Sequence, residues 1–188
     1  MYASAVEPDR TLSREDVLML MGSLPERVGD LVATLDEELI LYRHGPAFPT
    51  LKELVAHLAA AATALDGLLR EAGLEGRLEA DVGATIDPSS DPSLEPDPRP
   101  SGEDLMRAYA RVRRRTMDLV RGWEGEKWEL RLQDPRREET SLLDLCRLAT
   151  AHELGHLTQL RNLIALLPEP QDLGPVAASP APPPAPPA

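Results

Sequence analysis

The chain is poor in cysteine, in basic charge and in long apolar runs. Its one cysteine, Cys146, cannot form an intramolecular disulfide, so nothing in the chain requires an oxidising compartment. The 32 acidic residues outnumber the 20 basic ones and give a formal net charge of −12, which argues against binding to nucleic-acid phosphates. No apolar run approaches the ~18 residues that a membrane span needs. These absences predict a protein that binds neither nucleic acid nor membrane.

The two ends of the chain also lack features. The start, MYASAVEPDRTLSRED, has no basic patch followed by an apolar stretch, so it does not resemble a signal peptide, and we expect a cytoplasmic protein. At 188 residues the chain is long enough for one domain with a core of its own. We expect a flexible N-terminus over 1–12, one folded domain over 13–168 and a disordered Pro/Ala-rich tail over 169–188.

Helix starts are the clearest local signal that is present. Four segments place a hydroxyl residue three positions before a carboxylate, the pattern of a capping box or a close variant: Ser13 and Asp16, Thr50 and Glu53, Ser101 and Asp104, Ser141 and Asp144. Ser23 and Glu26 form a fifth such pair. This pair predicts that the first helical region breaks near Gly22, into a short helix over 13–21 and a longer one over 24–35.

Apolar residues recur at intervals of three and four behind each cap, as on one face of a helix. The second helix shows this from Leu54 to Leu68 and the last one from Leu142 to Leu167. Strand-like alternation is nearly absent; KWELRL, over 127–132, is the one convincing stretch. The arginines of RVRRRT, over 111–116, are expected on a solvated face. The fold class predicted is all-α, a four-helix bundle with up-down-down-up topology and a long crossover, over 74–100, between helices 2 and 3.

Three of the four histidines lie on apolar helical faces. His152 and His156 are one turn apart, so both imidazoles can reach a single ion. His57 follows Leu54 by three positions and also points inward. Neutral imidazoles in a dry core need partners, and a divalent ion bound by three nitrogens would provide them. It would also keep a position open for water or substrate. His44 has turn residues around it and is expected in a surface loop.

The same last helix contains H-E-x-x-H, over 152–156, which is the zinc-peptidase signature. In that reading Glu153 is a possible general base. The extended motif fails, because Gln159 and Asn162 stand where glycine and histidine are needed, and no sheet precedes the motif. The alternative for Glu153 is a boundary or surface glutamate, since it lies about 100° around the helix from His152.

Other polar residues near the histidines each have two interpretations. Glu53 could orient His57, but its capping box already explains it. Gln159 could hydrogen-bond within the site or to a partner helix. Cys146 is expected to be a small packed hydrophobe. Trp123 and Trp128 are expected to cover one end of the bundle rather than to bind a ligand.

Together these motifs resemble those of the DinB/YfiT-like superfamily of small four-helix bundles. The chain shares the inward histidine of LKELVAHLAA, the late H-x-x-x-H-x-x-Q pattern over 152–159, and the order of its helices and long crossover. The resemblance covers roughly 13–167. It departs where the family often has a tryptophan before the second helix, since Phe48 and Pro49 stand there.

The resemblance implies that His57, His152 and His156 hold a divalent metal, commonly zinc or nickel. It further implies a possible role in S-transfer or hydrolysis of small molecules, with a low-molecular-weight thiol or water as nucleophile, and a homodimer. A non-catalytic, metal-stabilised bundle related to stress and the zinc peptidase remain the alternatives. The sequence does not show whether the long loop closes over the site.

Overall fold

The structure, a computed structural model, describes residues 8–88, 100–134 and 139–168. Four long helices dominate it: α1 (Arg14–Val32), α3 (Leu51–Glu75), α5 (Gly102–Arg121) and α7 (Leu142–Ile164). The short elements are α2 (Glu37–Leu41), α4 (Val82–Ile86), α6 (Gly125–Trp128), β1 (Arg131–Leu132) and β2 (Thr140–Ser141). The predicted four-helix bundle is confirmed. The N-terminal residues 1–7 and the expected tail over 169–188 lie outside the described residues.

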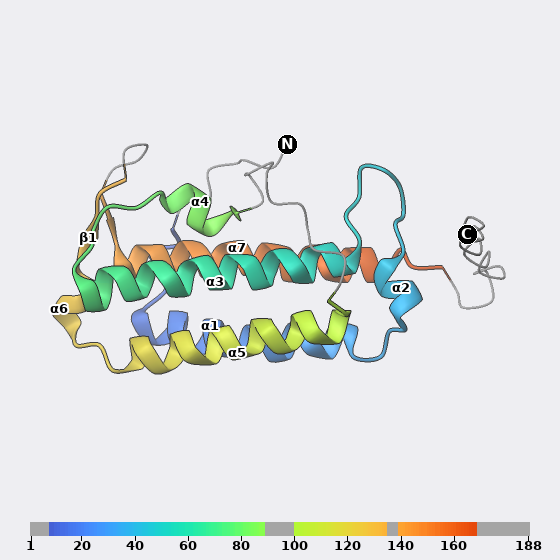
Figure 1. Cartoon of the computed structure of the whole chain (residues 1–188), viewed down its shortest axis with the longest axis horizontal. Coiled ribbons are helices and arrows are strands. Elements are labelled where there is room, and N and C mark those ends of the chain that lie inside the picture. Colours follow the sequence, from blue (N-terminus) through green and yellow to red (C-terminus); the bar gives the residue numbers. More distant parts are fainter. Residues whose placement is uncertain (1–7, 89–99, 135–138, 169–188) are drawn as a thin grey trace, which may run out of the picture.

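The long helices form two layers (Figure 1). One layer holds α3 and α7, the other holds α1 and α5, and across the layers α3 packs on α5 and α7 packs on α1. In this view α3 and α5 run from right to left, whereas α1 and α7 run from left to right. The connection between α3 and α5 therefore returns along the bundle. Its described part contains α4, which packs against α3 and α7.

The predicted caps stand at the starts of the long helices. Ser13, Thr50 and Ser101 each accept a hydrogen bond from the backbone three residues on, and the carboxylate at that position accepts one in return. The Ser141 side chain accepts from the Asp144 N–H. Such caps satisfy amide groups that have no partner within the helix.

The predicted break near Gly22 is wrong. Helix α1 is continuous through Pro25, and the Ser23 hydroxyl donates to the Leu20 carbonyl instead of capping a new helix. Its buried residues continue at intervals of three and four across this point: Val17, Met21, Leu24, Val28 and Val32. Burial of this one continuous face outweighs the hydrogen bond that proline cannot donate.

The core has two apolar parts with a polar layer between them. Leu65 of α3 and Met117 of α5 belong to one part, while Ala62 and Tyr109, on the same two helices, belong to the other. On α5 and α7 buried polar side chains stand between the two parts along the chain, and on α3 one directly follows Leu65; they are Asp66, Arg113, Thr116, Thr150 and Glu153. Four of them are hydrogen-bonded across the helices, whereas the Thr150 hydroxyl donates to the Cys146 carbonyl within α7. Buried polar groups require such partners.

Within this layer Glu153 of α7 is held by α5. The Tyr109 hydroxyl donates to Oε2 of Glu153 at 2.9 Å, and Nη2 of Arg113 donates to Oε1. Only 2% of Glu153 and 1% of Arg113 are exposed. Burial raises the pKa of Glu153, an effect that Arg113 opposes. Among the described residues, Nε and Nη1 of Arg113 are buried without an acceptor, so Glu153 is the principal compensation for its charge.

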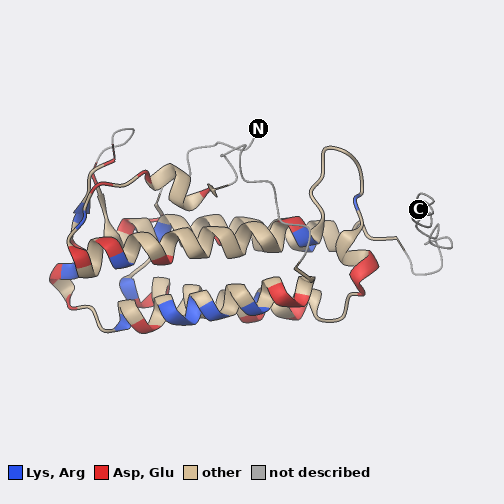
Figure 2. Ribbon diagram, viewed as in Figure 1, with Lys and Arg blue, Asp and Glu red and all other residues tan. Residues whose placement is uncertain are grey.

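These contacts correct two expectations. Glu153 is neither a boundary nor a surface residue. Arg113 is not on the solvated face expected for the arginines of 111–116, although Arg111, Arg114 and Arg115 are exposed. Figure 2 shows basic side chains, in blue, along α5. One of its members points inward because it pairs with an acid on α7.

A second crosslink joins α3 to α5 through Asp66. Its carboxylate accepts hydrogen bonds from Thr116 at 2.9 Å and from Arg70 at 2.9 Å, and it pairs with Arg115 at 2.6 Å. Burial disfavours the charged form, but these donors outweigh it and the pKa of Asp66 lies below 3.8. The two crosslinks fix the register of α5 against both helices of the other layer.

The tryptophans cover one end of the bundle, as predicted. Trp123 and Trp128 are 7% and 2% exposed and meet edge to face, with ring centroids 5.3 Å apart. The indole of Trp123 lies against Gly73 of α3, where an added Cβ would be 2.3 Å from Cζ2. No side chain larger than a hydrogen fits between them. Cys146 is fully buried in the same apolar part, and burial raises its pKa to about 12.

Replacement of Gly73 by alanine is expected to destabilise the protein by about 1–3 kcal/mol, because the methyl group forces the Trp123 ring to shift. Urea unfolding followed by circular dichroism measures this. Gly67→Ala is the matched control on the same helix, since nothing lies within 4 Å of its added Cβ. That change should stabilise by about 0.5–1 kcal/mol through helix propensity. Equal effects of the two changes would contradict the packing described.

Replacement of Glu153 by glutamine is expected to cost about 3–5 kcal/mol of unfolding free energy, because it leaves the buried Arg113 guanidinium without its counter-charge. The double variant Arg113→Met/Glu153→Leu removes both charges and should be more stable than the single variant. The same unfolding measurement compares them. A loss below about 0.5 kcal/mol for Glu153→Gln would show that the pair does not stabilise the fold.

Candidate metal centre

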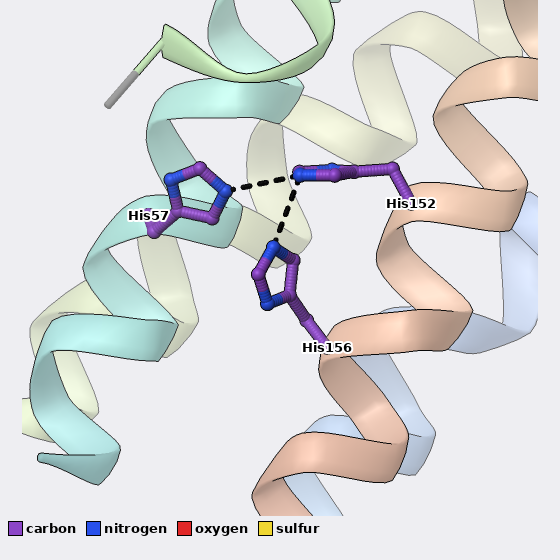
Figure 3. A group of neighbouring side chains, drawn as sticks. All are labelled: His57, His152 and His156. Carbon is purple, nitrogen blue, oxygen red and sulfur yellow. Dashed lines mark hydrogen bonds between the residues drawn. The ribbon is translucent and has the colours of Figure 1, made fainter. Parts of the chain in front are cut away.

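The three predicted histidines come together at the contact between α3 and α7. His57 extends from α3, and His152 and His156 extend from successive turns of α7 (Figure 3). One ring nitrogen of each lies within 4.8 Å of those of the other two. Nε2 of His152 is 3.2 Å from Nε2 of His57 and 3.0 Å from Nε2 of His156. Periodicity on two separate helices thus identified residues that meet in space.

The environment of the three rings keeps them neutral. Burial, followed by the charge of the neighbouring His156, lowers the pKa of His57 from 6.5 to about 4. Burial and the two other histidines lower the pKa of His152 to about 4 as well. The pKa of His156 is also lowered, chiefly by burial. Neutral imidazole is the form that coordinates a metal.

Gln159 fixes the proton of His156. Its side-chain oxygen lies 3.0 Å from Nδ1 of His156, so Nδ1 carries the hydrogen and donates it. The lone pair is then on Nε2, the nitrogen that faces the other two histidines. Metal-bound histidines commonly donate their second N–H in this way. Of the two interpretations of Gln159, the hydrogen bond within the site is therefore the one observed.

The remaining sequence candidates lie elsewhere. Glu53 accepts from the backbone of Thr50 and pairs with Arg43, so it acts as a cap. Both carboxylate oxygens of Glu153 bond to α5 side chains, whereas His152 and His156 face α3. These contacts give no support to Glu153 as a general base. His44 is exposed, as expected.

The zinc-peptidase alternative needs a strand beside the histidine helix to align a peptide. In the described ranges, the strands are β1 and β2, each of two residues, and they pair only with one another as Arg131 with Ser141 and Leu132 with Thr140. KWELRL contributes just its last two residues to β1, because 125–128 form α6. The third histidine of the cluster, His57, comes from α3. It is not part of the H-E-x-x-H motif, and it reaches the other two because α3 and α7 pack together in the bundle.

Sequence reasoning missed one residue beside the cluster. Asp87, the residue that ends α4, has Oδ1 3.9 Å from Nε2 of His57. Its charge acts to raise the pKa of all three histidines. In the sequence it stands in a stretch with several other acids and no periodicity, so only the docking of α4 reveals it.

Comparisons with known proteins agree with this fold. The family model described as the DinB superfamily matches residues 20–160. Among solved structures, YfiT from Bacillus subtilis matches with a TM-score of 0.65 and 15% identity, over 85% of this chain and 93% of that one. YfiT is described as a probable metal-dependent hydrolase with an unusual four-helix bundle topology.

No curated protein sequence matches the chain. No helix in the described parts combines the length and the hydropathy of a membrane span. The family match covers most of the chain, including both helices that carry the three histidines. The chain belongs to the DinB superfamily.

Proposed function

We propose that His57, His152 and His156 bind one divalent metal ion, zinc or nickel, and that the protein is a metal-dependent enzyme that hydrolyses small molecules. The observation that carries this proposal is the convergence of three Nε2 atoms from two helices. The description of YfiT, which shares the fold, as a probable metal-dependent hydrolase is consistent with it.

The residues present fit such an ion. With bonds of about 2.0–2.1 Å, two nitrogens on one tetrahedral ion are ~3.3 Å apart. The two measured separations, 3.2 and 3.0 Å, are close to that value. Three imidazoles are also a donor set that zinc and nickel accept. Without a cation, three neutral nitrogens at this spacing could share hydrogen bonds only in part.

Each residue of the site has a defined task. The histidines hold the ion, Gln159 keeps the proton of His156 away from it, and burial keeps the rings unprotonated. When bound, a divalent ion supplies a Lewis acid and lowers the pKa of a coordinated water or thiol. The His57 side chain is 10% exposed and the other two rings are half-buried. This partial exposure of the rings favours an ion that a small molecule can reach over a sealed structural ion.

The second candidate is S-transfer from a low-molecular-weight thiol, which needs the same accessible ion with sulfur in place of water. The observation in its favour is the same access to the cluster. A homodimer and a cytoplasmic location remain predictions. The non-catalytic bundle related to stress is the outcome expected if metal binds without turnover.

Replacement of His57 by alanine is expected to abolish stoichiometric metal binding, because it removes one of three nitrogens and the only one from α3. Elemental analysis of the protein, after reconstitution with zinc or nickel and removal of excess metal, measures the metal content per chain. His44→Ala is the matched control, since His44 is exposed and is not a member of the cluster. The wild type and the control should hold about one ion each. The proposed site would be contradicted if the wild type held no metal, or if His57→Ala held as much metal per chain as the wild type.

Metal-loaded protein is expected to hydrolyse members of a panel of small aryl esters and amides, and metal-free protein is not. His156→Ala should lose this turnover while His44→Ala retains it. Release of the coloured product measures the rate. Turnover that appears only when a small thiol and an electrophile are supplied would favour S-transfer. Metal binding without turnover in either assay would contradict the enzymatic part of the proposal.

A further inference from the structure

Helix α4 lies over the contact between the two helices that carry the histidines. It packs against both α3 and α7, and Figure 3 shows its light-green ribbon passing beside the rings of His57 and His152. This segment is part of the long connection between α3 and α5. The question left open by the sequence, whether that connection approaches the site, is answered for residues 82–88.

The position of α4 is fixed by apolar and polar anchors. Val82 is fully buried in the core, and Ile86 packs against the same apolar part. The Val82 N–H donates to Oδ2 of Asp134 at 3.0 Å, and the Ala80 N–H donates to the Gln133 carbonyl at 3.1 Å. These contacts tie the start of α4 to the end of β1. The segment is therefore packed against the bundle and held there by these contacts.

The anchors place Asp87 next to the histidines. Its backbone N–H donates to the Gly83 carbonyl at 2.9 Å and ends the helix. Pro88 follows, and the residue before a proline is restricted to extended backbone. The Asp87 side chain then extends to 3.9 Å from Nε2 of His57. This nitrogen is the one that faces the centre of the cluster.

The charge of Asp87 suits a ligand, and its distance from the cluster is close to that of one. Three neutral imidazoles leave both charges of a divalent ion uncompensated in a half-buried site, and a carboxylate offsets one of them. Adjacent oxygen and nitrogen ligands of one ion are about 3–3.3 Å apart, so 3.9 Å is slightly too long for direct coordination. The Asp87 side chain is 39% exposed, and a small rotation of its carboxylate would close that difference.

We propose that Asp87 is a fourth protein ligand, so that the metal centre has three imidazole nitrogens and one carboxylate oxygen, and that α4 delivers this ligand from the long connection. The inference rests on the proposed metal site at the three histidines. An added carboxylate makes the donor set harder and widens the range of ions it accepts towards manganese and iron. It also makes the end of α4 part of the site, and water or substrate then takes a fifth or sixth position on the ion.

Replacement of Asp87 by asparagine keeps the shape of the side chain and removes its charge. The variant is expected to bind zinc at least about tenfold more weakly than the wild type, as measured by competition with a chelating dye. Asp118→Asn is the matched control, because Asp118 is exposed on α5 and the change in net charge is the same. That variant should bind zinc within about twofold of the wild type. The melting temperature of each metal-free protein shows that the fold is intact.

Cobalt(II) distinguishes a ligand from a nearby charge. Loss of a coordinating carboxylate changes the visible absorption of the bound cobalt, whereas loss of a charge that does not touch the ion leaves it unchanged. Wild-type zinc affinity or an unchanged cobalt spectrum in Asp87→Asn, while His57→Ala loses the metal, would overturn the role of Asp87 alone. A wild type that binds neither zinc nor cobalt would overturn the proposed function and this inference together.

Discussion

The convergence of three uncharged imidazoles at one half-buried point is the constraint on which this structure depends. Nε2 of His152 has two short contacts with other ring nitrogens, and burial keeps the rings from taking up protons. A neutral ring nitrogen has either a hydrogen or a lone pair to offer, so the three cannot all satisfy one another. A cation among them removes the conflict. The Gln159 hydrogen bond, which turns the lone pair of His156 inward, fits that arrangement.

The rest of the bundle holds α3 and α7 in the register that this convergence requires. Neither helix is crosslinked to the other by a buried ion pair among the described residues; each is crosslinked to α5. Asp66 joins α3 to α5, and Glu153 joins α7 to α5. Apolar packing alone tolerates small sliding of helices. Sliding would break hydrogen bonds between buried polar groups, and leaving such groups without partners is destabilising. The polar layer therefore supports the histidine cluster from the middle of the bundle, and its Glu153 is the residue next to His152 along the chain.

Features with a local signal were predictable from the sequence. The caps of Ser13, Thr50 and Ser101 follow from hydroxyl and carboxylate spacing, and the inward direction of His57 follows from its place among leucines. The prediction of the all-α class and of the three histidines as one group rests on these caps and on the spacing of apolar residues. The resemblance to the superfamily reached the same three histidines by a separate route.

Features that depend on a partner in space were missed. Arg113 looks like one of several surface arginines, and only the opposite position of Glu153 on α7 explains its burial. The continuity of α1 past Pro25 depends on a core face whose neighbours the sequence does not show. Asp87 needed the docking of α4, which is set by contacts of Val82 with residues far away in the chain. In each case the deciding contact is long-range.

The most direct test of the account is anomalous diffraction from crystals of the zinc-loaded protein, recorded on both sides of the zinc absorption edge. The account predicts one anomalous peak between α3 and α7, about 2.0–2.1 Å from Nε2 of His57, His152 and His156. A peak coordinated by other residues, or no peak in protein that has been given zinc, would contradict it. The histidines would then be polar core residues that satisfy one another and water.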